Sequence, residues 1–161
     1  MDKYKFVKYK KNHPKLFEKE KAKLKKIIPD AGIEHIGSTS IEGLGGKGII
    51  DILVFVPKKN IKKIRDKLVS SKYYLVKTGG NKERMFFEKD YGLLKKRRIH
   101  LHLTSINSKT YKEAIRFRNY LRRNSSLRKK YSIIKQKAIL LGKKNKEYRD
   151  FKKRFIQEVL K

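Results

Sequence analysis

Apolar side chains recur at helical spacing between residues 16 and 28. They are Leu16, Phe17, Leu24, Ile27 and Ile28. Asn12 is placed to cap this helix, Pro14 suits its first turn, and Pro29 and Gly32 follow its end. The pattern therefore predicts an amphipathic helix near the start of the chain.

Two apolar runs follow that are too short for helices. Residues 33–36 predict a short strand, and residues 49–56, IIDILVFV, are apolar on both faces and stop at Pro57. Such a run is typical of a strand covered on both sides, so we expect it in the middle of a sheet. The intervening GSTSIEGLGGKG has too many glycines for an ordinary element, although residues 39–44 fit a single helical turn.

Alternating and helical patterns continue beyond this strand. Residues 58–70 place Ile61, Ile64 and Leu68 on one face of an amphipathic helix. Residues 73–77 and 84–88 predict a hairpin around TGGN, and residues 99–104, IHLHLT, predict a further strand.

From residue 109 onward the pattern predicts three helices. Asn124 or Ser125 can cap the second, Gly142 can end it, and Asn145 can cap the third. We therefore expect an α/β (α+β) fold, with a mixed sheet flanked by helices and a C-terminal helical segment. The length fits one domain over residues 1–161, with an α/β core to residue 106 and helices over residues 107–161.

The chain is strongly basic, with 46 Lys and Arg against 15 Asp and Glu and a net charge of +31. Such a field attracts RNA and other polyanions and concentrates anionic substrates. The cations are spread along the whole chain, which equally fits a lysine-rich surface that serves solubility. The net charge alone fits both interpretations.

The composition also excludes some classes of site. There is no cysteine, so disulfides and thiolate metal sites are excluded. The first residues lack the apolar core of a signal peptide, and the longest apolar runs are too short to cross a bilayer. We therefore expect a cytoplasmic protein without a membrane partner.

Candidate chemistry gathers around Gly37, Ser38 and Asp51. A glycine lets a phosphate approach the backbone, and a serine hydroxyl with the following amides can donate to phosphate oxygens. An aspartate is costly to bury in a run as apolar as residues 49–56 unless something pairs with it. A carboxylate there could hold a divalent cation against the same phosphate.

These features resemble a known family. The segment HIGSTSIEGLGGKGIIDILV, residues 35–54, is similar to the GrpB family signature, which reads roughly HIGSTAVPGLAAKPIIDI, within the nucleotidyltransferase superfamily. Further matching segments are RMFF at 84–87, the HLH of 100–102, FRNYLR at 117–122, and Tyr131, Lys135, Tyr148, Lys152 and Phe155. The resemblance implies a nucleotidyltransferase fold that binds a nucleoside triphosphate with Mg²⁺ or Mn²⁺ and transfers a nucleotide to an acceptor.

One departure from the superfamily leaves an alternative open. Members that transfer nucleotides usually carry two acids one residue apart on the central strand, and here the second position is Leu53. His100 and His102 face the same side of their strand and could compensate above Asp51, as metal ligands or as a general base. Otherwise the two histidines merely cover a solvent-exposed strand face. Leu53 and the basic charge also leave open a second function, a non-catalytic module that binds nucleotide or nucleic acid with an incomplete acidic site.

The remaining site candidates are polar residues near these strands. Candidates for phosphate or nucleotide contacts are Gly37, Ser38, Thr39, Ser40, Lys47, Arg84 and Arg118. The resemblance favours Arg118 over Tyr120 as the side chain that faces the site. His35 either touches substrate or makes a structural hydrogen bond. Glu88 is either a distal carboxylate or an ordinary ion-pair partner of nearby lysines.

Overall fold

The computed structural model describes residues 5–91, 97–141 and 146–161, which form five helices and five strands. In chain order these are α1 (His13–Ile27), β1 (Gly32–Ile36), β2 (Ile50–Val56), α2 (Ile61–Ser70), β3 (Tyr74–Leu75), β4 (Arg84–Tyr91), β5 (Arg97–Ser105), α3 (Lys109–Arg123), α4 (Ser125–Leu141) and α5 (Lys146–Leu160). Short 3₁₀ turns occupy Ser38–Ser40, Lys58–Asn60 and Lys77–Gly79. The predicted α+β class with a mixed sheet is confirmed.

The sheet has the strand order β1-β2-β5-β4-β3. Strands β2 and β5 run parallel, and the other neighbouring pairs are antiparallel. The strand of residues 49–56 was expected in the middle, but β5 holds that position and β2 is one place from the edge. The reason is that β5 pairs with β2 on one side and with the long hairpin partner β4 on the other.

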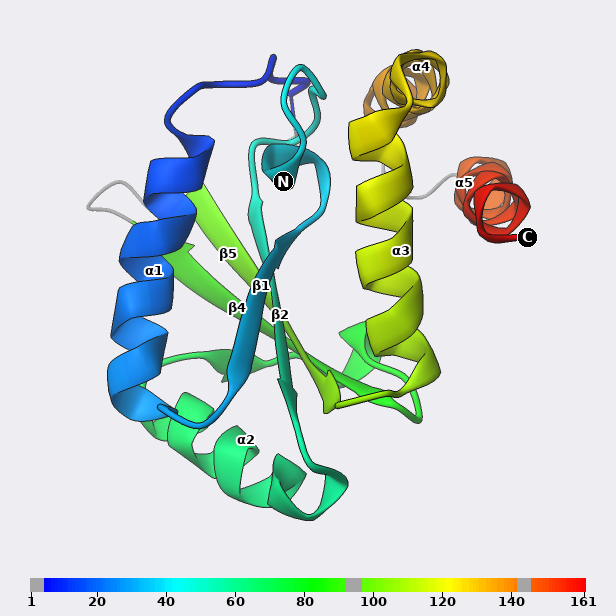
Figure 1. Cartoon of the computed structure of the whole chain (residues 1–161). Coiled ribbons are helices and arrows are strands. Elements are labelled where there is room, and N and C mark those ends of the chain that lie inside the picture. The colour runs from blue at the N-terminus through cyan, green and yellow to red at the C-terminus, as the bar shows by residue number, and fades with distance from the viewer. Residues whose placement is uncertain (1–4, 92–96, 142–145) are drawn as a thin grey trace.

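Helices cover both faces of this sheet. Figure 1 shows α1 on one side and α3 on the other, with α4 and α5 beyond α3. On the first side Leu24 of α1 and Leu68 of α2 pack with Ile52, Val54 and Leu101 in one apolar cluster. Because side chains alternate along a strand, Asp51, which lies between core residues of β2, must point to the α3 side.

The α3 side has its own apolar cluster, which ties the glycine-rich loop to the C-terminal helices. Ile41 and Leu44 of the loop pack with Leu121 of α3, Tyr131 of α4 and the partly buried Phe155 of α5. The rings of Tyr131 and Phe155 stack with centroids 5.5 Å apart. This packing fixes α4 next to the loop between β1 and β2.

A buried carboxylate on the opposite side links α1 to the hairpin. Glu20 is fully buried, and its Oε1 accepts hydrogen bonds from the Tyr73 hydroxyl at 2.5 Å and from Lys89 Nζ at 2.9 Å. Burial alone would raise the pKa of Glu20, but the bonds from Tyr73 and Lys89 outweigh it and lower that pKa. The helical periodicity of α1 did not predict that Glu20 is buried.

Element boundaries differ from the sequence predictions in local detail. Asn12 precedes α1 but makes no side-chain capping bond, whereas Asn124 Oδ1 accepts from Leu127 N at 3.0 Å and so caps α4. Strand β3 is shorter than predicted because the 3₁₀ turn Lys77–Gly79 follows it. The predicted roles of Gly142 and Asn145 lie outside the described residues. No helix in the described ranges has the length and apolar character needed to cross a bilayer.

Candidate functional site

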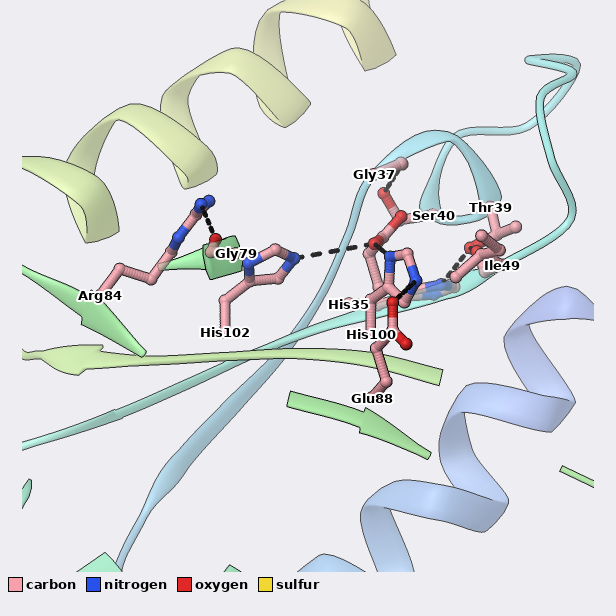
Figure 2. A network of polar contacts seen from close by, with 11 residues as sticks. His35, Gly37, Thr39, Ser40, Ile49, Gly79, Arg84, Glu88, His100 and His102 are labelled. Atoms are coloured by element: carbon pink, nitrogen blue, oxygen red, sulfur yellow. Dashed lines mark hydrogen bonds and ion pairs between the residues drawn. The ribbon is translucent and has the colours of Figure 1, made fainter. Parts of the chain in front are cut away.

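Three polar residues form one row across the α3 side of the sheet. The strand register places Asp51 of β2 opposite His100 of β5, and His100 opposite Glu88 of β4. His100 Nδ1 lies 3.4 Å from Asp51 Oδ1, and His100 Nε2 lies 3.5 Å from Glu88 Oε1. Figure 2 shows the His100 ring with Glu88 below it. The side chains remain partly accessible, with Asp51 24% exposed, so a ligand can reach them.

The next row along the sheet adds a second imidazole. His102 lies between Leu53 of β2 and Phe86 of β4, and its Nε2 is 3.7 Å from Asp51 Oδ1. Both histidines therefore face Asp51, as the alternation of IHLHLT predicted. Leu53 is fully buried, which makes the position of the expected second acid part of the apolar packing.

The two imidazoles set the charge state of Asp51. Burial by itself would raise the pKa of Asp51, but the neighbouring imidazoles of His100 and His102 hold it well below its ordinary value. Burial lowers the pKa of His102, and the adjacent carboxylate opposes that shift. Asp51 is consequently ionised at neutral pH, the state in which a carboxylate binds a cation.

The Gly37–Ser38 turn lies directly against this carboxylate. Gly37 has φ 72° and ψ −173°, a conformation that is essentially restricted to glycine. A Cβ at Gly37 would clash with the carboxyl group of Asp51. The backbone of the turn is therefore in direct contact with the Asp51 carboxyl group.

Thr39 and Ser40 follow in the 3₁₀ turn, but their hydroxyl groups serve the loop itself. Ser40 Oγ donates to the carbonyl oxygen of Gly37 at 2.7 Å, and Thr39 Oγ1 donates to Ile49 O at 3.0 Å (Figure 2). These bonds hold the turn in shape. The expected direct contacts of Thr39 and Ser40 with phosphate stay predictions.

His35 occupies the other side of the sheet, towards α1. Its ring stacks on Phe17 at 4.5 Å between centroids, and its Nε2 lies 3.0 Å from Thr39 Oγ1. Because the Thr39 hydroxyl donates its only proton to Ile49 O, it accepts from Nε2–H of His35. Burial lowers the pKa of His35 to about 4, so the ring is neutral at neutral pH. This environment supports the structural role of His35 that the sequence left open.

The three basic candidates are placed differently from one another. Lys47 is exposed on the loop. Arg118 is buried and donates from Nη1 to Glu34 Oε2 at 2.7 Å and to His35 O at 2.8 Å, which ties α3 to β1. Arg84 lies near His102, and its Nη2 donates to Gly79 O at 2.9 Å (Figure 2). Their proposed contacts with phosphate are untested, and Tyr120 is exposed on another face of α3.

Lys135 of α4, which the site prediction omitted, approaches the turn from the C-terminal helices, and Lys152 of α5 lies near Lys135. A Cβ built on Gly46 would lie 2.5 Å from Ser38 Oγ and 3.2 Å from Lys135 Nζ, so this ammonium group sits beside the Ser38 hydroxyl. Burial lowers the pKa of Lys135, Lys152 of α5 lowers it further, and Asp51 opposes the shift. Only the family resemblance had pointed to these lysines, because sequence spacing does not bring α4 to the loop.

The donor types at this site suit a divalent metal only in part. One carboxylate and two imidazoles converge, and both donor types bind Mn²⁺. Within the described ranges, however, no three His, Asp or Glu side chains are arranged to hold a metal ion by themselves. Asp51 would need phosphate oxygens or water to complete a coordination shell.

Comparison with known proteins identifies the family. A model described as GrpB protein matches residues 3–161. The chain belongs to the GrpB family. A relative named glutamate-rich protein GrpB, from Alkalihalophilus pseudofirmus, is 32% identical over 160 residues, which are 96% of this chain and 92% of the relative. The resemblance drawn from residues 35–54 is thereby confirmed.

Solved structures agree with this assignment. The crystal structure of conserved protein GrpB from Enterococcus faecalis matches with a TM-score of 0.79 and 27% identity over 97% of each chain. The Cid1 poly(U) polymerase, solved with MgGTP bound, matches with a TM-score of 0.52 and 13% identity over 80% of this chain and 42% of that one. At this identity the second match shows the fold alone, which is nucleotidyltransferase-like.

Proposed function

We propose that this GrpB protein binds the triphosphate of a nucleoside triphosphate together with Mg²⁺ or Mn²⁺, and transfers the nucleotide to an acceptor. The observation that carries the proposal is the convergence of three elements. The Gly37–Ser38 turn, the Asp51 carboxylate and the Lys135 ammonium group meet at the α3 side of the sheet. A hydroxyl donor, a metal-binding carboxylate and a cation are the groups that a polyphosphate requires.

The environment of Lys135 supports an anion in this place. Lys135 is partly buried, and burial lowers the pKa of its ammonium group, with Lys152 of α5 adding to that shift. Negative charge nearby stabilises such a cation, and Asp51 already supplies some of it. The phosphates of a nucleotide would supply more, with Ser38 Oγ donating to the same group.

In the proposed reaction the residues of the chain hold and orient the substrate. A metal ion at Asp51 would neutralise phosphate charge. Ser38 and Lys135 would fix the phosphates so that an acceptor hydroxyl attacks the α-phosphorus in line, with a new P–O bond formed and the bond to pyrophosphate broken. His100 or His102 would take the hydroxyl proton, and pyrophosphate would leave.

Replacing Lys135 by glutamine tests the phosphate contact. We expect the affinity for MgATP and MgUTP, measured by isothermal titration calorimetry, to fall ~10-fold, because one charge-assisted hydrogen bond is lost. Lys137→Gln, an exposed position on the same helix, is the matched control and should bind as the wild type does. Equal affinities in the two variants, or no nucleotide binding by the wild type, would count against the proposal.

A second candidate function is a non-catalytic module that docks on RNA. The buried Leu53 favours it, since it leaves one carboxylate where two are usual. Exposed residues on one face of α3 also fit a nucleic-acid backbone. Lys112, Arg116 and Arg123 follow one another at helical spacing with Tyr120 among them, and the Arg116 guanidinium lies 5.6 Å from the Tyr120 ring.

Fluorescence anisotropy with a single-stranded RNA separates this candidate from the first. If the module docks on RNA through about four phosphates, affinity should fall on the order of 100-fold between about 50 and 200 mM salt. Arg116→Gln with Arg123→Gln should weaken binding, whereas Arg65→Gln on α2 and Asp51→Asn should not. Binding that depends on Asp51 and on metal would contradict the module and support the nucleotide site.

A further inference from the structure

An extended arm, residues 5–9, crosses the glycine-rich loop between β1 and β2. Val7 pairs with Gly46 in an isolated antiparallel bridge: Val7 N donates to Gly46 O at 2.7 Å, and Gly46 N donates to Val7 O at 3.0 Å. Figure 1 shows the chain passing from the first turn of α1 across to this loop. The arm and the loop, which are distant in sequence, therefore share a pair of backbone hydrogen bonds.

Side chains of the arm occupy space that the loop leaves open by lacking side chains. A Cβ built on Gly45 would clash with the ring of Phe6, and one built on Gly48 would lie 3.7 Å from the Val7 side chain. Phe6 and Val7 are both half-buried, and Gly45 is buried. The arm thus packs directly on the backbone of the loop, an approach that a larger residue at position 45 would prevent.

The residue that the arm holds is also a wall of the candidate phosphate site. Gly46 bonds to the arm through its N–H and C=O, and it meets the site at its Cα. A Cβ built on Gly46 would lie 2.5 Å from Ser38 Oγ, 3.2 Å from Ser38 Cβ and 3.2 Å from Lys135 Nζ. The position of Gly46 consequently limits where the Ser38 hydroxyl and the Lys135 ammonium group can lie.

This part of the loop needs contacts from elsewhere to stay ordered. Four of the six residues 43–48 are glycine, so fixing their backbone costs more conformational entropy than in an average segment. Leu44 and Ile49 are buried on either side of residues 45–48, and the arm bonds to the stretch between them. Contacts from the arm offset the entropy cost at the place where the site is formed.

We propose that Phe6 and Val7 are positioning residues of the phosphate site. They strap residues 45–48 in place and keep Gly46 against Ser38 Oγ and Lys135 Nζ. That these two groups hold phosphate rests on the proposed function, whereas the strap itself is a property of the protein without ligand.

The strap is tested first without ligand, by NMR. The α-proton of Gly46 that takes the place of a Cβ should give a nuclear Overhauser effect to the Ser38 β-protons. Phe6→Ala should abolish this signal and accelerate amide hydrogen exchange at Gly46 ~10-fold or more, because the segment can then open locally. Val7→Pro, which removes the donor to Gly46 O, should do the same.

Two further variants serve as controls for these measurements. Phe6→Leu keeps an apolar side chain over Gly45 and should restore the signal and the slow exchange. Lys8→Ala removes an exposed side chain from the same arm and should change neither. Signals between Ile52 of β2 and Leu101 of β5, which are paired in the sheet, should persist in every variant and establish that the fold is intact.

Nucleotide affinity gives the second measurement. If the freed segment adopts the site-forming arrangement about one-tenth of the time, the affinity of Phe6→Ala for MgATP should fall ~10-fold, and Phe6→Leu should bind as the wild type does. An unchanged Gly46 signal and exchange rate in Phe6→Ala and Val7→Pro would overturn the proposal, as would full affinity after the signal is lost. Absence of nucleotide binding by the wild type would reject the proposed function, while loss of the signal in both variants would still establish the strap.

Discussion

Asp51→Asn is expected to reduce metal-dependent transfer from labelled nucleoside triphosphates by on the order of 100-fold or more. Asparagine keeps the shape of the side chain but removes the charge that the two imidazoles hold in its ionised form. Without this charge a metal ion would lose its anionic ligand. Beside the Gly37–Ser38 turn, His100 and His102 would be the remaining candidate metal ligands. Nucleotide binding in the presence of Mg²⁺ should weaken in parallel.

The experiment requires a defined comparison. Transfer is measured with labelled ATP or UTP, Mg²⁺ or Mn²⁺, and a panel of RNAs and small acceptors. Asp66 is an exposed acid on α2 beside Arg65, on the other side of the sheet. Asp66→Asn removes the same charge there and should leave nucleotide transfer unchanged. Transfer that persists in Asp51→Asn would reject the catalytic part of the proposal, and circular dichroism would establish that the variant is folded.

Gly37→Ala is the second change with a large expected effect. The backbone conformation at Gly37 is essentially restricted to glycine, and a Cβ there would meet the Asp51 carboxyl group. We expect a loss of ~3 kcal/mol in the free energy of unfolding, from backbone strain and displacement of that carboxylate. Nucleotide affinity should fall with it, because the turn can no longer lie against Asp51.

Gly43→Ala is the matched control for this substitution. Gly43 also has a positive φ, 77°, but nothing lies within 4 Å of a Cβ built there. Gly43→Ala should lower the free energy of unfolding by ~1 kcal/mol, the cost of the left-handed backbone alone. Urea unfolding measures both variants, and similar losses in the two would show that the contact between Gly37 and Asp51 contributes nothing.

Much of the fold follows from local pattern. The run of residues 49–56 predicted a strand covered on both sides, and the alternation of IHLHLT placed both histidines on one face, where the structure has them. The choice of β5 as the central strand was not predictable, because strand order depends on pairing between distant segments. The same limit applies to Glu20, whose buried pairing with Tyr73 and Lys89 no periodicity of α1 reveals.

The candidate site was likewise predictable from the sequence only in part. The sequence by itself determined Asp51, the Gly37–Ser38 turn and the two histidines, because an acid in an apolar strand and a glycine before a serine are local signals. Only the tertiary structure placed Lys135 beside Ser38, directed Arg118 to Glu34, and set Glu88 against His100. Those three relations join residues on different elements, and packing between elements, not spacing along the chain, decides which charges meet.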